Sequence, residues 1–152
     1  MSRAKNFLSY WLPVIVWVCI IFTASGDSAS AQHSSRIIGP IVRWLFPHLD
    51  EHAVESIVFY VRKCAHLTEY AIFALLVWRA VRKPFRGDTR PWSWRHAAIA
   101  VGAAALFAAS DEIHQSYVPH REGKFFDVVI DTCGAALGIL ALWFLGAWRK
   151  RW

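Results

Sequence analysis

The chain has 152 residues and a formal net charge of +6, and 56% of its residues are hydrophobic, against about 45–50% in ordinary soluble proteins. This length suits one domain over residues 1–152, and a single soluble core of that size cannot bury 9 Trp and 10 Phe. The composition therefore predicts a membrane protein in contact with membrane lipid. Although a positive charge is also typical of nucleic-acid-binding proteins, the basic residues lie between apolar runs, so nucleic acid is not an expected partner.

Four apolar stretches lie at about residues 7–24, 57–81, 96–113 and 125–147. Each is long enough to cross a bilayer core of ~30 Å, which takes about 20 helical residues. No alternation of apolar and polar residues indicates strands. We therefore predict an all-α membrane protein with four transmembrane helices.

The first stretch has an alternative interpretation as a signal peptide. Arg3 and Lys5 precede it, and residues 29–31 read Ala-Ser-Ala, as a cleavage site would. The apolar run is longer than the usual ~7–15 residues of a signal peptide, and it contains Trp11 and Trp17. A retained helix is the favoured interpretation, and cleavage stays open.

The basic residues predict the orientation, because short loops rich in Lys and Arg stay in the cytoplasm. Three segments that share one side of a four-span protein hold most of these residues. They are Arg3, Lys5, Arg79, Arg82, Lys83, Arg86, Arg90, Arg95, Arg149, Lys150 and Arg151. We expect both termini to be cytoplasmic. The connection at 25–55 then faces outward. It contains an apolar piece at 37–46 that is too short to span the membrane and is interrupted by Pro40, with Pro47 behind it. We predict that this piece is an interfacial or re-entrant segment.

Ionisable and polar side chains from three predicted helices lie at similar heights in the membrane. Lys63, His66 and Tyr70 share a helix face, and Glu69 borders it near the middle of the membrane. Such groups are costly in a bilayer and usually face a bundle interior or a water-filled cavity. The candidate binding residues are Lys63, His66, Glu69, Tyr70, Asp111, Glu112, Gln115, Arg121, Asp127 and Asp131. Gly134 and Gly138 continue the last face as a seam for a neighbouring helix.

Three readings of this cluster stay open: a ligand-binding site, a catalytic site and a purely structural ion-pair network. For catalysis the candidates are His66, Glu69, Asp111, His114 and Asp131, acting as acid–base groups or as metal ligands. The order of these residues matches no metal motif, and the three cysteines form no C-x-x-C pair, so we expect neither a metal nor another cofactor.

Two segments resemble the signatures of VanZ-like proteins. Residues 62–70, RKCAHLTEY, resemble a K-x-x-H-x-x-E-Y signature, and residues 110–121, SDEIHQSYVPHR, resemble D-E-x-x-Q-x-x-x-P-x-R. Asp127, Asp131 and the two glycines fit the helix that follows, whereas His120 and Lys124 depart from the family pattern. The resemblance implies a four-helix protein of the bacterial cytoplasmic membrane, in a family whose named member is associated with low-level resistance to teicoplanin. It implies no settled reaction.

Taken with this resemblance, the cluster predicts an outward-facing site for an envelope lipid or a glycopeptide-related ligand. The alternatives are an intramembrane enzyme that acts on a lipid-linked substrate and a helix bundle that assists a partner.

Overall fold

A computed structural model describes residues 3–26, 30–85, 88–117 and 124–152. The elements in these ranges are α1 (Arg3–Gly26), α2 (Ser30–Leu45), α3 (Glu51–Arg82), α4 (Trp94–Gln115) and α5 (Phe125–Trp148). Four of them, α1, α3, α4 and α5, are long and apolar enough to cross a membrane. The predicted all-α fold is confirmed, with α2 as a fifth helix in the connection between the first two spans.

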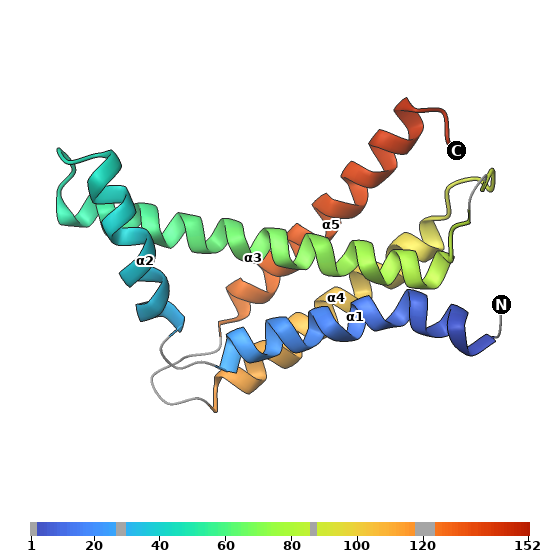
Figure 1. The fold of residues 1–152 in the computed structure, drawn as a ribbon, viewed down its shortest axis with the longest axis horizontal. Coiled ribbons are helices and arrows are strands. Elements are labelled where there is room, and N and C mark those ends of the chain that lie inside the picture. The colour runs from blue at the N-terminus through green and yellow to red at the C-terminus, as the bar shows by residue number, and fades with distance from the viewer. Residues whose placement is uncertain (1–2, 27–29, 86–87, 118–123) are drawn as a thin grey trace.

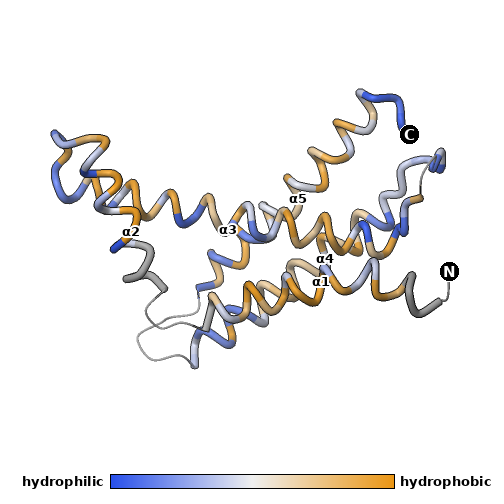
Figure 2. The backbone as a smooth tube through the Cα atoms, viewed as in Figure 1, coloured by the Kyte–Doolittle hydropathy of each residue, from blue (hydrophilic) through white to orange (hydrophobic). Residues whose placement is uncertain are grey.

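Helix α3 is the centre of the arrangement and contacts each of the other four helices. The start of α1, the connection from α3 to α4 and the end of α5 lie at one end of the bundle (Figure 1), as four spans require. Two hydrogen bonds tie this end together: Tyr10 Oη donates to the carbonyl oxygen of Pro84 at 2.8 Å, and Arg79 donates to that of Ser9 at 3.2 Å. Hydrophilic residues gather at this end, at the α2–α3 connection and where α4 ends and α5 begins, and the helices between these places are mostly apolar (Figure 2).

Helix α3 begins at Glu51, six residues before the predicted start at 57. The side chain of Asp50 caps it by accepting the N–H of Ala53 at 2.8 Å. The first two turns of α3 are polar, so they do not belong to the apolar run from which the start was predicted. Polar residues at a helix start do not disfavour a helix. With 32 residues, α3 is about 48 Å long and exceeds the ~30 Å of a bilayer core.

Helix α2 corrects the prediction that prolines interrupt this segment. Pro40 lies inside a continuous helix, and only Pro47 follows its end. A proline inside a helix removes one backbone hydrogen bond. Packing offsets that loss, because Ile38 and Val42 lie against Val54 and Val58 of α3.

Small side chains allow α4 to pack closely in the core. Ala100, Ala104 and Ala108 repeat at every fourth residue and are fully buried. They join the same core as Tyr70 and Phe73 of α3. This alanine face continues into Asp111, so the packing of α4 carries a carboxyl group into the protein interior.

Aromatic rings close the end of the bundle where the α3–α4 connection lies. The centroids of Trp92 and Trp152 are 5.1 Å apart, and Trp78 lies 5.5 Å from Trp92. The guanidinium of Arg82 lies over the rings of Trp78 and Trp152. Beside it, hydrogen bonds from Arg90 hold the pKa of the Asp88 carboxyl well below its usual range.

Candidate functional site

Two polar pairs connect α3 to α5. Lys63 Nζ lies 2.5 Å from Asp127 Oδ1, and one turn deeper His66 Nδ1 lies 3.5 Å from Asp131 Oδ1. Helical periodicity explains the arrangement, because residues three or four apart share a face. The sequence predicts these faces but not which carboxyl group each side chain meets.

Asp131 is the buried member of these two pairs. The side chains of Lys63, Asp127 and His66 are 22%, 24% and 30% exposed, whereas that of Asp131 is 1% exposed. A separation of 3.5 Å suits an ion pair with protonated His66 but is long for a hydrogen bond. Accordingly, among the described residues neither carboxyl oxygen of Asp131 has a hydrogen-bond partner.

Helix α4 adds two buried carboxyl groups. Asp111 is 2% exposed, and its Oδ2 accepts a hydrogen bond from Gln115 Nε2 at 2.9 Å. Its Oδ1 has no such partner within the described part of the chain. Glu112 Oε2 accepts the backbone N–H of Lys124 at 2.7 Å, at the start of α5. A carboxylate there complements the positive end of the helix dipole.

Tyr70 lies in the core between these helices and is fully buried. Its ring packs against Phe73 and Phe107, with centroids 6.4 and 6.2 Å away. The hydroxyl group has no hydrogen-bond partner in the described ranges. A buried phenol normally has one, so this group can donate to or accept from a molecule that enters the cluster.

Glu69 is half-buried, and its carboxyl group lies within electrostatic range of His66, Asp131 and Asp111. Its backbone carbonyl accepts a hydrogen bond from Trp17 Nε1 of α1 at 3.0 Å. Trp17 is therefore a positioning residue, and it is not among the residues predicted from the sequence. A Trp in the middle of an apolar run, away from the membrane surfaces where Trp is favoured, was the available signal.

The remaining candidates separate from this group. His114 stacks on Phe22 of α1, with ring centroids 4.3 Å apart, and so faces α1. Arg121 lies outside the described residues. Among those that are described, no three His, Cys, Asp or Glu side chains are grouped as a metal ion would require.

Close glycine contacts hold α5 against α3 below the polar pairs. A Cβ atom added to Gly134 would lie 2.8 Å from the Cα atom of Leu67, and one added to Gly138 would lie 2.9 Å from the Cβ of Ala71. Neither distance is tolerated. The predicted small-residue seam is therefore present, and it sets the spacing at which His66 and Asp131 face each other.

A family model described as VanZ/LLP1 matches residues 10–146. The chain belongs to the VanZ/LLP1 family. No significant match is found among curated proteins or among solved structures. The match includes every one of the predicted site residues, and together with the four apolar helices it makes the chain a multi-pass membrane protein.

The interior of this VanZ/LLP1 family member is rich in hydrogen-bond acceptors. Asp131 and Asp111 present three carboxyl oxygens without hydrogen-bond partners in the described residues, and Tyr70 adds a hydroxyl. Buried polar atoms are usually paired, and each unpaired one calls for an explanation. A bound polar group would supply the missing partners, and His66 beside Asp131 can exchange a proton with it.

Proposed function

We propose that this protein binds the polar part of a cell-envelope lipid or a glycopeptide-related ligand in the cluster between α3, α4 and α5. The site opens outward in a bacterial cytoplasmic membrane, with both chain termini on the inner side. One observation carries the proposal: Asp131 is almost fully buried, and neither carboxyl oxygen has a hydrogen-bond partner among the described residues.

The energetics favour a ligand at this position. An ionisable side chain within a membrane span is expensive and is usually functional. Leaving a buried acceptor without a partner costs about 1–3 kcal/mol, and more for a charged group. A ligand that donates hydrogen bonds to Asp131 and Asp111 recovers this cost on binding. The family resemblance supports this ligand class, since it points to the cell surface and to teicoplanin susceptibility.

The test is Asp131→Asn, which keeps the shape of the side chain and removes its charge. Cells that carry the wild-type protein should differ in teicoplanin susceptibility from cells without it, and the variant should lose that difference. The loss of one charge-assisted hydrogen bond, about 1.5–3 kcal/mol, weakens binding roughly 10- to 100-fold. Mass spectrometry of the purified wild type should identify a co-purified envelope lipid that the variant lacks.

Thr132→Val is the matched control, because Thr132 is the next residue and, among the described residues, its hydroxyl donates a hydrogen bond only to the carbonyl of Val128. It should leave susceptibility unchanged. If Asp131→Asn keeps the wild-type phenotype while its melting temperature falls sharply, the cluster is a structural network that holds the bundle together.

A second candidate, an intramembrane acid–base enzyme, is supported by the juxtaposition of His66 and Asp131 at 3.5 Å. A carboxylate beside an imidazole can orient it and exchange a proton with it, as a general acid–base pair requires. Turnover of a lipid-linked substrate by the purified protein, abolished in His66→Gln, would establish this activity. Binding without turnover would leave the ligand-binding proposal.

A further inference from the structure

The first part of α3 projects beyond the four-helix bundle and carries α2. Lys63 pairs with Asp127 in the first turn of α5, so residues 51–62 of α3 lie beyond the start of α5 by about 18 Å along the helix. Helix α2 lies against this projection (Figure 1). The two helices form a helical hairpin, the α2–α3 hairpin, distinct from the polar cluster described above.

A cavity of about 300 Å³ lies between the two helices of the hairpin. Val54, Val58 and Phe59 form its apolar wall. This volume is at the lower end of the roughly 300–1,000 Å³ of small-molecule sites. The cavity therefore suits a group the size of a lipid headgroup and is too small for the acyl chains.

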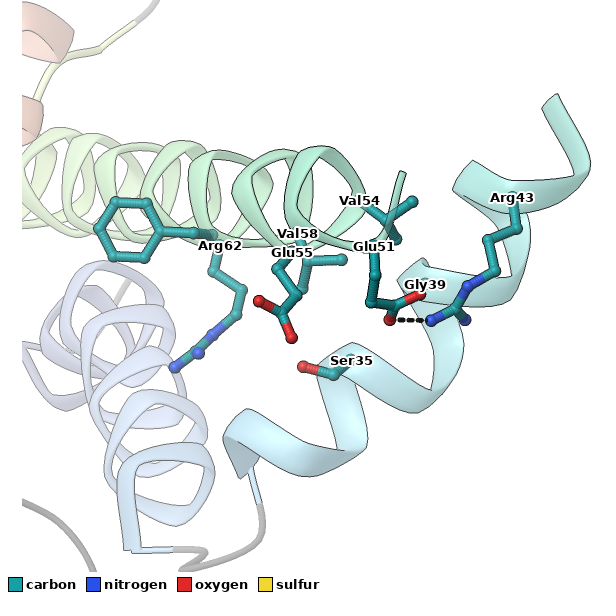
Figure 3. Close-up of a pocket in the computed structure, with 9 residues that line it drawn as sticks. Ser35, Gly39, Arg43, Glu51, Val54, Glu55, Val58 and Arg62 are labelled. Carbon is teal, nitrogen blue, oxygen red and sulfur yellow. Dashed lines mark hydrogen bonds and ion pairs between the residues drawn. The ribbon is translucent and has the colours of Figure 1, made fainter. Parts of the chain in front are cut away.

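Charged side chains of both signs line the cavity, and the two carboxylates among them differ in their partners. Arg43 of α2 forms an ion pair with Glu51 of α3. Glu55, one turn further along α3, has no ion pair or hydrogen bond to any described residue, and its carboxylate points into the cavity between Arg62 and the hydroxyl of Ser35 (Figure 3). An occupant would therefore meet an acceptor for a cation at Glu55 and a guanidinium beside it.

The outside of the hairpin exposes several large apolar side chains. Trp44 is 80% exposed, and Ile37 and Ile41 of α2 are exposed on neighbouring turns. On α3, Phe59, which lines the cavity, and the next residue, Tyr60, are both exposed. An amphipathic helix with an exposed Trp is typical of a segment that lies in the membrane interface. The cavity consequently opens next to a surface suited to acyl chains.

We propose that the cavity of the α2–α3 hairpin binds a phospholipid whose headgroup carries a primary ammonium group. The ammonium group donates hydrogen bonds to Glu55, and the phosphate lies beside Arg62, whose planar guanidinium suits phosphate oxygens. The acyl chains run along Phe59 and the exposed face of α2. This site is independent of the ligand proposed for Asp131.

The test uses the full-length protein, stripped of lipid in detergent and mixed with equal amounts of three phospholipids that have the same acyl chains. Phosphatidylethanolamine has N–H donors and a phosphate, phosphatidylcholine has a cation without N–H donors, and phosphatidylglycerol has a phosphate without a cation. Native mass spectrometry should show phosphatidylethanolamine retained in preference to both others. Equal retention of the three lipids would overturn the proposal.

Two single variants locate the preference. Glu55→Gln should reduce retention of phosphatidylethanolamine about tenfold, as expected for one charge-assisted hydrogen bond. Glu51→Gln removes the same charge from the same cavity, but that charge faces Arg43, so the preference should persist. Unchanged retention in Glu55→Gln, or an equal loss in both variants, would refute the assignment to Glu55.

The two proposals fail separately. Glu55 is exposed and lies on the projecting part of α3, so its substitution should leave the melting temperature and any teicoplanin phenotype of the polar cluster unchanged. Asp131→Asn, in turn, should leave the preference for phosphatidylethanolamine intact. A loss of this preference in Asp131→Asn and not in Glu55→Gln would place the lipid in the polar cluster and defeat the hairpin site.

Discussion

The close approach of α3 and α5 predicts a sharp cost for a single methyl group at Gly134. In Gly134→Ala the new Cβ would lie 2.8 Å from the Cα and 2.9 Å from the carbonyl carbon of Leu67, whereas ordinary contacts begin at 3.4 Å. The obstacle is backbone, and the carbonyl oxygen of Leu67 lies closer still, so no side-chain rotation relieves the clash. The helices must separate by more than about 0.6 Å, the difference between 3.4 and 2.8 Å. Overpacking of this kind costs about 1–3 kcal/mol.

Alanine also favours helix over glycine by about 1 kcal/mol, which opposes the overpacking. Because the clash is with backbone, we take the upper part of the overpacking range and expect a net loss of about 2 kcal/mol. For a chain of this length the melting temperature should fall by about 4–8 °C. The assay is thermal unfolding of the purified protein in detergent. The same separation would move Asp131 away from His66, so teicoplanin susceptibility should change as well.

Gly102→Ala is the control, because an added Cβ there meets nothing within 4 Å. It carries the same gain in helix propensity without the clash, so its melting temperature should stay the same or rise slightly. If the melting temperature of Gly134→Ala equals that of Gly102→Ala and is not lower, α3 and α5 do not pack at the distance seen here.

Three further predictions concern orientation, the α3–α4 connection and Glu69. In a background without the native cysteines, Asp88→Cys should react with an impermeant thiol reagent only after the cells are opened, and labelling of intact cells would reverse the proposed orientation. Asp88→Asn should lower the melting temperature at pH 7. Since Arg90 lowers the pKa of Asp88 in the folded protein, the stabilisation is present above the unfolded pKa of about 3.9 and is lost as the pH falls below it. The difference from wild type should therefore shrink on acidification, and a growing difference would contradict the pairing. Glu69→Gln should insert and melt like the wild type, because no hydrogen bond or ion pair of that carboxyl within the described ranges is removed. It should nevertheless lose the teicoplanin phenotype. A wild-type phenotype with a large fall in melting temperature would favour a structural role.

The sequence was sufficient for the spanning helices and their faces, because both follow from local periodicity. The alanine face of α4 and the glycine seam of α5 are visible as repeats of three or four residues. The sequence was not sufficient for the start of α3, since the part of this helix beyond the hydrocarbon core has no apolar run to mark it. Pro40 was misleading for a related reason: the packing of α2 on α3, which offsets the lost hydrogen bond, is a tertiary contact.

The pairs between helices were beyond sequence reasoning for a different reason. Lys63 has several carboxyl groups at similar height, and choosing Asp127 requires the relative register of α3 and α5. The side of α4 that meets α1 likewise decides that His114 stacks on Phe22 and does not join Asp131. The α2–α3 cavity depends on an additional contact between two helices, and Glu55 has no feature in the sequence that distinguishes it from an ordinary surface acid.

Both the polar pairs and the glycine contacts specify the register of α3 and α5, but they do so with different strictness. Ion pairs alone would specify it weakly, because a lysine can reach a carboxyl group one turn away with little loss. The contacts of Gly134 and Gly138 with α3 backbone tolerate no such shift. They hold the helices together whatever the charge of Asp131, so this carboxyl group is not needed as a structural tie. That separation is the reason to expect Asp131→Asn to affect the ligand and Gly134→Ala to affect both ligand and fold.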